Sequence, residues 1–307
     1  VDLTLDKERE LNIRLNKNSG SWDYDALANM FDTDELTDWG FTEGELVGFD
    51  LEDKAGLIDD DDIPEAVESV CKLGNLWELG QHRLLCGDST KKENIELLLD
   101  ATNPDFFVYD PPFVSTRGTF QSEIRGIEEF KNNLSVFDGV LENHFQNGVI
   151  VTFLSTRELL ELYSLSNSPI SFRHEYLWII EDTSATIMQS KVTPITKHCI
   201  IAVFRKIGEK AEYSSKDSTS SIIETNRGEG GKKIHKHQKP ISITVDMLKR
   251  YRGNIALDTF LGSGSTLIAC EKTNRVCYGM ELDEHYCDVI INRWEQFTGK
   301  KAKLLNG

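Results

Sequence analysis

Between residues 75 and 305, short apolar runs alternate with helical segments, and this alternation constrains the fold more than any other feature of the chain. The apolar runs are bounded by glycine, proline or acidic residues, as buried strands commonly are. We expect a hairpin at 76–90 and strands at 105–110, 148–154, 174–184, 197–206, 254–258 and 276–282. We expect helices at 92–100, 128–146, 156–165, 240–252, from about 264, and at 284–298. The pattern predicts an α/β fold in which helices flank a mixed, mostly parallel sheet.

Charge divides the chain into two parts. Residues 1–68 hold 21 acidic and 5 basic side chains, whereas the other 239 residues hold 30 and 29, so the net charge of −17 belongs to the N-terminal part. We therefore expect a small, acidic, helical flank at 1–66 and one larger domain at 67–307. The larger domain has a basic cluster at 227–239, inside a segment that we expect to be a long loop, 206–238. Such a cluster is either a solvated surface or a phosphate-binding one.

Composition narrows the class of protein. No apolar run approaches the ~18 residues of a membrane span, and no signal peptide is visible. The six cysteines form no CxxC pair and the seven histidines show no metal-ligand spacing, so we expect reduced thiols and no metal site. These features predict a cytoplasmic protein that does not contact a membrane. The oligomeric state stays open.

A glycine turn between two strands gives the first chemical signal. The stretch ALDTFLGSGSTLIACEKTNRVCYGMELD, 256–283, predicts a strand that ends at Asp258, a turn with Gly262 and Gly264, a helix, and a strand that ends at Glu281. Glycines let the backbone approach a ligand closely, and the helix start offers free N–H groups. An acid about 20 residues after the turn can bind ribose hydroxyls. The unit therefore predicts a site for a nucleoside-type cofactor.

Three cofactor classes compete for this site. A P-loop requires Gly-Lys-Ser/Thr, which is absent, and a dinucleotide fingerprint requires a third glycine where Leu267 stands. S-adenosylmethionine (SAM) needs the ribose acid but has no pyrophosphate, and it fits best. A nucleotide-dependent oxidoreductase on a similar sheet remains as an alternative.

A proline turn gives the second signal. In VYDPPFVSTRG, 108–118, an apolar run ends in Asp110, Pro111, Pro112 and Phe113. Two prolines cannot continue a central strand, so the strand must stop in a rigid turn. The exocyclic amine of adenine or cytosine is a poor nucleophile because its lone pair is delocalised into the ring. Asp110 and the Pro111 carbonyl could accept its two N–H bonds and free the lone pair, while Phe113 stacks on a flipped base.

With these residues the sequence resembles the DNA amino-methyltransferases, which modify adenine N6 or cytosine N4. Asp110-Pro111-Pro112-Phe113 is similar to the catalytic motif Asp/Asn/Ser-Pro-Pro-Tyr/Phe/Trp, and 258–266 is similar to the SAM motif Asp-x-Phe-x-Gly-Ser-Gly-Thr. HKHQKP at 235–240 resembles a His-x-x-Gln/Glu-Lys-Pro element that helps to form the SAM pocket, and LLCGDS at 84–89 resembles a segment whose acid contacts the adenine of SAM. The motif order is that of the β group.

The resemblance implies a Rossmann-like, SAM-dependent methyltransferase fold that acts on double-stranded DNA. The implied catalytic residues are Asp110, Pro111, Pro112 and Phe113. The implied SAM-binding residues are Asp88, Lys239, Pro240, Asp258, Phe260, Gly262, Ser263, Gly264, Ser265, Thr266 and Glu281. Ser263, Ser265 and Thr266 could also cap the helix, and Lys239-Pro240 could simply start one.

Target recognition is expected between the two motifs, at about 114–127 and 183–238. Arg117 and Arg125 would close over the flipped base, and Lys232, Lys233 and Lys236 would contact phosphates. An aspartate in first position is typical of the family's adenine enzymes, so we expect N6 methylation of adenine. N4 methylation of cytosine and a catalytically silent SAM- and DNA-binding module are the alternatives. Residues 8–32 resemble the tail of ParB-like domains, which implies such a domain as a further partner.

Overall fold

The structure is a computed structural model. It describes residues 7, 33–39, 41, 56–57, 70–111, 120–154, 159–160, 162, 164, 170–180, 198–206, 220–225, 239–251 and 253–306. The chain forms two compact units, Val1–Asp53 and Lys54–Gly307. In the first unit, helix α3 (Thr33–Asp38) is described, and Phe41 donates its N–H to the carbonyl of Leu36. Residues 8–32, with their ParB-like pattern, all lie outside the described part.

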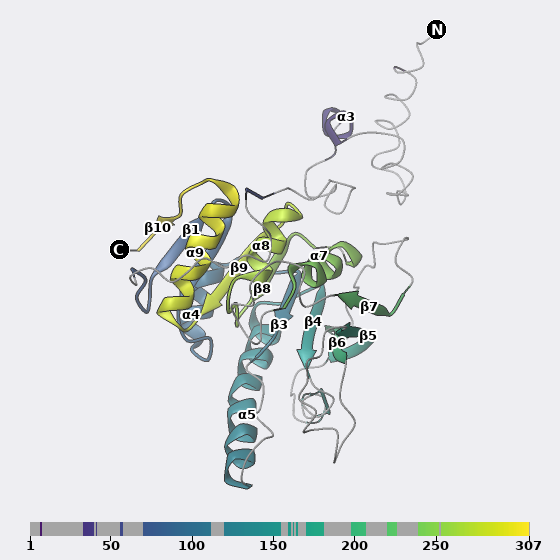
Figure 1. Ribbon diagram of the computed structural model, residues 1–307, viewed down its shortest axis with the longest axis vertical. Coiled ribbons are helices and arrows are strands. Elements are labelled where there is room, and N and C mark those ends of the chain that lie inside the picture. Colours follow the sequence, from purple (N-terminus) through teal and green to yellow (C-terminus); the bar gives the residue numbers. More distant parts are fainter. Residues whose placement is uncertain are drawn as a thin grey trace. The chain divides into compact units, whose positions relative to one another are not determined.

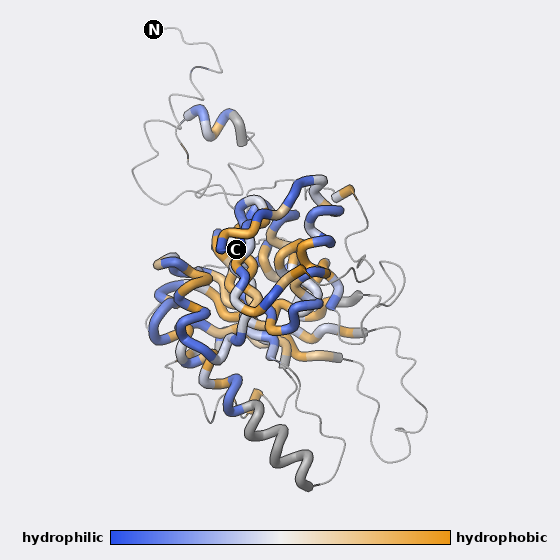
Figure 2. The backbone as a smooth tube through the Cα atoms, turned by 90° about the vertical axis from the view of Figure 1, so that its left-hand side faces the viewer, coloured by the Kyte–Doolittle hydropathy of each residue, from blue (hydrophilic) through white to orange (hydrophobic). Residues whose placement is uncertain are grey.

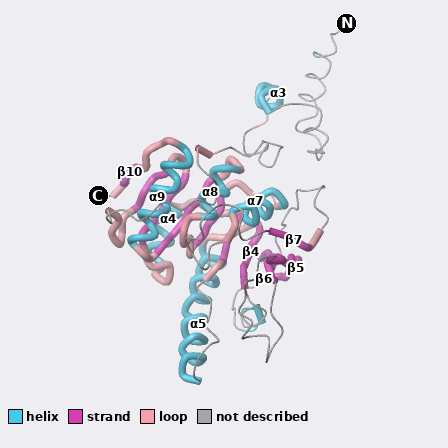
Figure 3. Tube along the Cα trace, viewed as in Figure 1, coloured by secondary structure: helices cyan, strands magenta, loops and turns pink. Residues whose placement is uncertain are grey.

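The second unit is built on a 10-stranded sheet, drawn in Figures 1 and 3. Its strands are β1 (Leu76–Leu79), β2 (His82–Cys86), β3 (Phe106–Tyr109), β4 (Val149–Leu154), β5 (Ile170–Ile180), β6 (His198–Lys206), β7 (Ile222–Thr225), β8 (Ile255–Asp258), β9 (Val276–Glu281) and β10 (Lys303–Leu304). Their order in space is β10-β1-β2-β9-β8-β3-β4-β6-β5-β7.

The centre of the sheet is parallel and its flanks are mixed. Neighbouring strands run parallel from β2 through β9, β8 and β3 to β4. The pairs β10–β1, β1–β2, β4–β6 and β6–β5 are antiparallel, and β5–β7 is parallel. The expected mixed, mostly parallel sheet is confirmed.

Helices cover both faces of the sheet. The described helices of the second unit are α4 (Lys92–Leu99), α5 (Phe120–Asn143), α7 (Ile241–Arg250), α8 (Ser265–Lys272) and α9 (Glu284–Thr298). Strand side chains alternate between two buried clusters, one shared with α7, α8 and α9 and the other with α4 and α5. In Figure 2 the apolar residues lie along these inner segments. None of the described helices is long and apolar enough to cross a membrane.

Three sequence-based expectations about elements are wrong in detail. The expected loop 114–127 is helical from residue 120, because α5 begins at Phe120 and not near 128. Gly126 lies inside this helix, where glycine costs about 1 kcal/mol but does not end the pattern. Inside the expected loop 206–238, Ile222–Thr225 forms β7, and Ile170 begins β5 four residues before the expected start.

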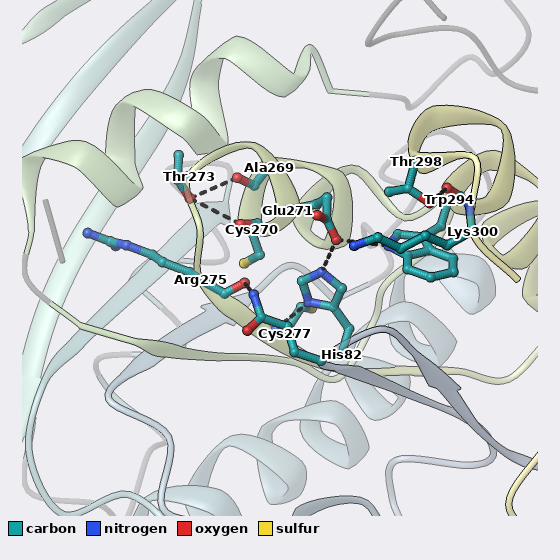
Figure 4. A network of polar contacts seen from close by, with 11 residues as sticks. His82, Ala269, Cys270, Glu271, Thr273, Arg275, Cys277, Trp294, Thr298 and Lys300 are labelled. Atoms are coloured by element: carbon teal, nitrogen blue, oxygen red, sulfur yellow. Dashed lines mark hydrogen bonds and ion pairs between the residues drawn. The ribbon is translucent and has the colours of Figure 1, made fainter. Parts of the chain in front are cut away.

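A buried polar network connects α8, the helix that follows the glycine turn, with α9, β2 and β9 (Figure 4). His82 of β2 contacts Glu271 of α8 at 2.9 Å, and the indole N–H of Trp294 in α9 donates to the same carboxylate oxygen at 3.0 Å. Cys277 of β9 donates its N–H to His82 Nδ1 at 2.9 Å, which implies that the ring proton lies on Nε2 and points to Glu271. The network therefore fixes α8 and α9 against β2 and β9.

Candidate active site

Four neighbouring parallel strands end in acids at the same edge of the sheet. β2, β9, β8 and β3 lie side by side, and Asp88, Glu281, Asp258 and Asp110 lie at or just after their carboxyl ends. The register agrees with this placement, because Val108 pairs with Asp258 across β3 and β8. Parallel strands bring their carboxyl ends to one edge, so residues up to 193 positions apart in the sequence share a site.

This edge contains the point where the connectivity of the sheet reverses. From β8 the chain goes to β9 on one side, whereas from β3 it goes to β4 on the other. In open α/β sheets, ligands bind at such a switch point, outside the carboxyl ends of the strands. Asp258 and Asp110 end the two strands that flank it, so the glycine turn and the proline turn meet there.

The two carboxylate oxygens of Asp110 have different environments. Lys239 Nζ donates a hydrogen bond to Oδ2 and forms an ion pair with it. Oδ1 is shielded from solvent and accepts no hydrogen bond from the residues that the structure describes. Pro111, the next residue, is buried. A shielded polar atom without a partner is uncommon in folded proteins and requires an explanation, of which a functional role is one.

Lys239 and Pro240 lie directly before α7. Pro240 is buried at the N-cap position of this helix. The Lys239 side chain is only 12% exposed, and its ammonium lies 4.9 Å from the centre of the Phe153 ring in β4. The segment thus starts a helix, as one interpretation of the sequence had it, and its lysine reaches the acid of the proline turn.

The two glycines of the glycine turn are required for different structural reasons. Both have positive φ, +57° at Gly262 and +85° at Gly264, a conformation that favours glycine. A Cβ at Gly264 would lie 3.1 Å from Ile290 Cγ1, so this glycine lets the turn pack against α9. A Cβ at Gly262 would meet only Phe260 O, at 4.0 Å. Gly262 is therefore the position at which a ligand can approach the backbone.

Asp258 is buried, and both of its oxygens are bound within the glycine turn. Oδ1 accepts the N–H of Phe260 at 2.9 Å, and Oδ2 accepts the hydroxyl of Thr266 at 2.6 Å. The pKa of Asp258 is raised to about 7, mainly by burial, with the charge of Asp110 adding to the shift and the bonds from Thr266 and Phe260 opposing it. These contacts make Asp258 the residue that shapes the turn.

Glu281 connects the glycine turn to the end of β9. Its Oε2 accepts the N–H of Gly262 at 2.8 Å, and its Oε1 accepts the N–H of Asp283 at 2.9 Å. Burial raises the pKa of Glu281, and bonds from Asp283, Gly262 and Leu282 oppose that shift. A carboxylate has about four acceptor positions. Glu281 therefore keeps capacity for a ligand hydroxyl.

Asp88 lies beside Glu281 at the edge of the site. Gly87 donates its N–H to the carbonyl of Glu281 at 2.8 Å, which joins the ends of β2 and β9. Asp88 Oδ1 accepts the hydroxyl of Thr90 at 2.7 Å and its N–H at 2.9 Å. The hydroxyl bond is the main cause that lowers the pKa of Asp88. Asp88 is thus an ionised hydrogen-bond acceptor next to Glu281, the acid expected to bind ribose.

Helix capping does not explain the hydroxyl residues of the glycine turn. The N-cap of α8 is Gly264, which has no side chain that could cap the first N–H groups of this helix. The Thr266 hydroxyl binds Asp258 instead, and Ser265 Oγ donates to the carbonyl of Lys239 at 3.4 Å. None of the three hydroxyl residues is the N-cap of α8, so the capping interpretation is wrong.

A family model for DNA methylases of the N6 and N4 type matches residues 104–293, more than half of the chain. The range contains Asp110, Lys239, the glycine turn and Glu281. The chain belongs to the N6/N4 DNA methylase family.

Two solved structures share the fold of this DNA methylase. The M1.HpyAVI–SAM complex is 18% identical, with 68% of this chain and 97% of that chain covered and a TM-score of 0.52. The cytosine-N4-specific PvuII DNA methyltransferase is 14% identical, with 68% and 85% covered and a TM-score of 0.50. At these identities the likeness shows the fold, and the expected methyltransferase-type α/β fold is confirmed.

A buried arginine that supports the methylase's glycine turn was not predicted from the sequence. Arg293 of α9 is 1% exposed, and its Nη1 donates to the carbonyl of Ser263 at 2.8 Å. The two residues are 30 positions apart, so no local motif joins them. Arg293 could have been identified from its position. It lies next to Trp294, on the buried side of an otherwise amphipathic helix.

Several predicted site residues lie outside the described part of the chain. They are Pro112, Phe113, Arg117, Lys232, Lys233 and Lys236. Arg125 belongs to the backbone of α5, but its side chain is not described.

The raised pKa of Asp258 predicts a pH dependence of stability. The unfolded carboxyl titrates near pH 4 and the folded one near pH 7. Between these values the folded state binds more protons, so the free energy of unfolding should fall as pH rises. Urea unfolding of the wild type and of Asp258→Asn should show that the wild type alone loses about 1 kcal/mol from this group between pH 5 and 6. Equal slopes for the two proteins would contradict this.

Proposed function

We propose that this DNA methylase transfers a methyl group from SAM to N6 of an adenine that has been flipped out of double-stranded DNA. The observation that carries the proposal is the Asp110 carboxylate at the switch point. One of its oxygens is held by Lys239, and the other is a shielded acceptor with no donor among the described residues. This oxygen is suited to an amine N–H.

The residues at the glycine turn fit SAM. The open space beside Gly262 admits a ligand next to the backbone, and Glu281 retains acceptor capacity for a ribose hydroxyl. The N–H groups at the start of α8, whose N-cap is Gly264, suit the carboxylate of SAM. Four acids at this edge, of which Asp88 has a lowered pKa, complement its positive sulfonium.

The proposed chemistry depends on two acceptors of the proline turn. Asp110 Oδ1 accepts one N–H of the adenine amine and the Pro111 carbonyl accepts the other, so the nitrogen lone pair is less delocalised into the ring. When bound, SAM supplies a methyl group on a cationic sulfur. The bond between this sulfur and the methyl carbon breaks readily, because the leaving group is a neutral thioether. Asp110 Oδ1 is then placed to receive the proton that the amine loses after its N–C bond has formed. Phe113 is proposed to stack on the flipped base.

Cytosine N4 methylation is the second candidate. Its amine also presents two N–H groups to Asp110 and Pro111, so the described geometry suits both bases. The preference for adenine rests on the aspartate in first position of the motif. Incubation with SAM and DNA that lacks methylated bases, followed by digestion and mass spectrometry of the nucleosides, tests the choice. N6-methyladenine is expected, N4-methylcytosine would overturn the base, and the absence of both would overturn the activity.

Glu281→Ala should weaken SAM binding. Loss of hydrogen bonds to a charged group costs about 1.5–3 kcal/mol, which is roughly a tenfold to hundredfold rise in Kd. Isothermal titration with SAM measures this directly. Glu96→Ala, which removes an exposed glutamate of α4 that pairs with Lys92, is the matched control and should bind SAM as the wild type does. Unchanged affinity of Glu281→Ala would remove the ribose assignment.

Double-stranded DNA should be bound through the basic segment, with Lys232, Lys233 and Lys236 at phosphates and Arg117 and Arg125 near the base. Affinity should then fall steeply with salt, because each phosphate contact releases counterions. Changing the three lysines to glutamine should reduce the slope of log Kd against log salt by about 3. The same change at three exposed lysines, Lys300, Lys301 and Lys303, is the control. Equal slopes for the two triple variants would show that the segment faces solvent.

A further inference from the structure

We infer that Lys239 is a positioning residue for Asp110: it binds one carboxylate oxygen, directs the other toward the substrate amine, and keeps the group negatively charged. This inference rests on the proposed function and extends it. Lys239 belongs to a motif that resembles a part of the SAM pocket. In the structure, however, its ammonium contacts the acid of the proline turn, 129 positions earlier in the chain.

Three elements hold Lys239 in place. Pro240, at the N-cap of α7, restricts the backbone of Lys239, which precedes it, and Ser265 at the start of α8 donates to the Lys239 carbonyl at 3.4 Å. The ammonium lies 4.9 Å from the centre of the Phe153 ring, a distance at which a cation is attracted to the ring face. A lysine side chain loses considerable rotamer freedom when it is held in this way. The contact with Asp110 is thus built by the fold and is more than a chance surface pair.

The contact with Lys239 gives the two carboxylate oxygens of Asp110 different roles. Oδ2 is bound by Lys239, so rotation of the carboxylate is restricted. Oδ1 is shielded from solvent and has no donor in the described part of the chain. Correct orientation of a reacting group contributes strongly to catalysis. Without Lys239, either oxygen could face the amine and the carboxylate could turn away.

The positive charge of Lys239 has a second role, because it affects the ionisation of the neighbouring acids. Among the described residues, the charged groups that face Asp110 are Lys239 and the buried Asp258. The pKa of Asp258 responds to both, since Asp110 raises it and Lys239 lowers it. Two neighbouring acids disfavour each other's ionisation, and the cation bound to Asp110 offsets this. Removing the cation should therefore make protonation of the pair easier.

Lys239→Met tests the inference, because methionine has a similar length and no charge. Initial rates of methyl transfer from tritium-labelled SAM to unmethylated genomic DNA are measured from pH 5.5 to 9. The acid side of the profile should move to higher pH by about one unit, which is about a tenfold loss of rate on that limb. SAM affinity, measured by isothermal titration, should stay at the wild-type value. Lys239→Arg, which keeps the charge, should keep the wild-type position of the acid limb.

Lys206→Met is the matched control. The Lys206 ammonium is also partly buried, and it donates to the carbonyls of Leu141 and Phe145 near the end of α5. Loss of this lysine should lower stability without moving the pH profile. If Lys206→Met moves the profile as Lys239→Met does, the effect comes from weakened folding and the inference is wrong.

A double variant decides whether Lys239 acts through Asp110. Asp110→Asn keeps a carbonyl acceptor but cannot hold a charge, so adding Lys239→Met to it should change neither the residual rate nor its pH profile. Independent, multiplicative losses would overturn the inference. So would weakened SAM binding in Lys239→Met with an unmoved acid limb, which would place Lys239 at the cofactor. A wild-type protein without methyl transfer would refute the proposed function itself, and this inference with it.

Discussion

Asp110→Ala should reduce methyl transfer by about a thousandfold or more, the scale seen when a positioned acceptor and its charge are lost together. Alanine leaves the Pro111 carbonyl as the remaining acceptor, so one N–H of the amine has no partner and the lone pair stays delocalised. It also leaves the Lys239 ammonium largely buried without its carboxylate. Mass spectrometry of nucleosides after incubation with SAM and unmethylated DNA gives the ratio to wild type.

SAM binding distinguishes a chemical defect from a damaged site in this variant. The proposed cofactor residues lie at the ends of β8, β9 and β2, whereas Asp110 follows β3. Isothermal titration of Asp110→Ala should therefore give an affinity close to that of the wild type. Methylation at a wild-type rate would eliminate the proposed role of Asp110. Loss of both activity and SAM binding would show that the substitution disturbs the switch point as a whole.

The strands that carry the four acids could be predicted from the sequence. The strands β3, β8 and β9 are short apolar runs that end at an acidic or glycine-rich break, and such runs are buried on both faces of a parallel sheet. The acid at the end of each run was therefore placed correctly at a strand terminus. The helix expected at 284–298 is α9, and Asp283, directly before it, is its N-cap and accepts the N–H of His285.

The contacts between these segments could not be predicted, because they depend on strand order. The sequence places Lys239 before a helix, in an element that resembles part of a SAM pocket. Only the adjacency of β8, β3 and β4 brings it to Asp110 and Phe153. Arg293 and Ser263 are a second case of a pair defined by packing alone.

Edge strands were missed for a different reason. The four-residue β7 has an Ile222 side chain that is 48% exposed, and β10 has only two residues, Lys303–Leu304. A strand at the edge of a sheet buries little apolar surface, so it leaves a weak pattern in the sequence. Central strands such as β3, with all four side chains buried, leave a strong one.

Gly148→Ala should lower the free energy of unfolding by about 2–6 kcal/mol, the sum of about 1–3 for backbone strain and about 1–3 for overpacking. Gly148 has φ +126°, and a Cβ there would lie 1.8 Å from the carbonyl oxygen of Asp105. The clash involves backbone atoms, so no side chain can turn aside to relieve it. Urea unfolding, monitored by circular dichroism, measures the change.

Gly139→Ala provides the control with the same chemical change and the opposite expected sign. Gly139 lies inside α5, and a Cβ there would meet no atom within 4 Å. Alanine should stabilise this helix by about 1 kcal/mol, because glycine is the poorer helix former. If both variants lose stability equally, the close approach of Gly148 to Asp105 does not determine how the start of β4 packs against Asp105.

The effect of Gly148→Ala should extend to the active site, because Asp105 joins three strands at the opposite ends from the acids. Its carbonyl accepts the N–H of Val149 at 3.1 Å, and its carboxylate accepts the N–H groups of Asn254 and Ile255, each at 2.9 Å. These bonds set how β3, β4 and β8 begin relative to one another. A displaced Asp105 therefore shifts β3 along β8, and with it Asp110 relative to the glycine turn. Methyl transfer by the folded fraction of Gly148→Ala should fall well below that of Gly139→Ala, and equal rates would show that the strand ends are fixed independently.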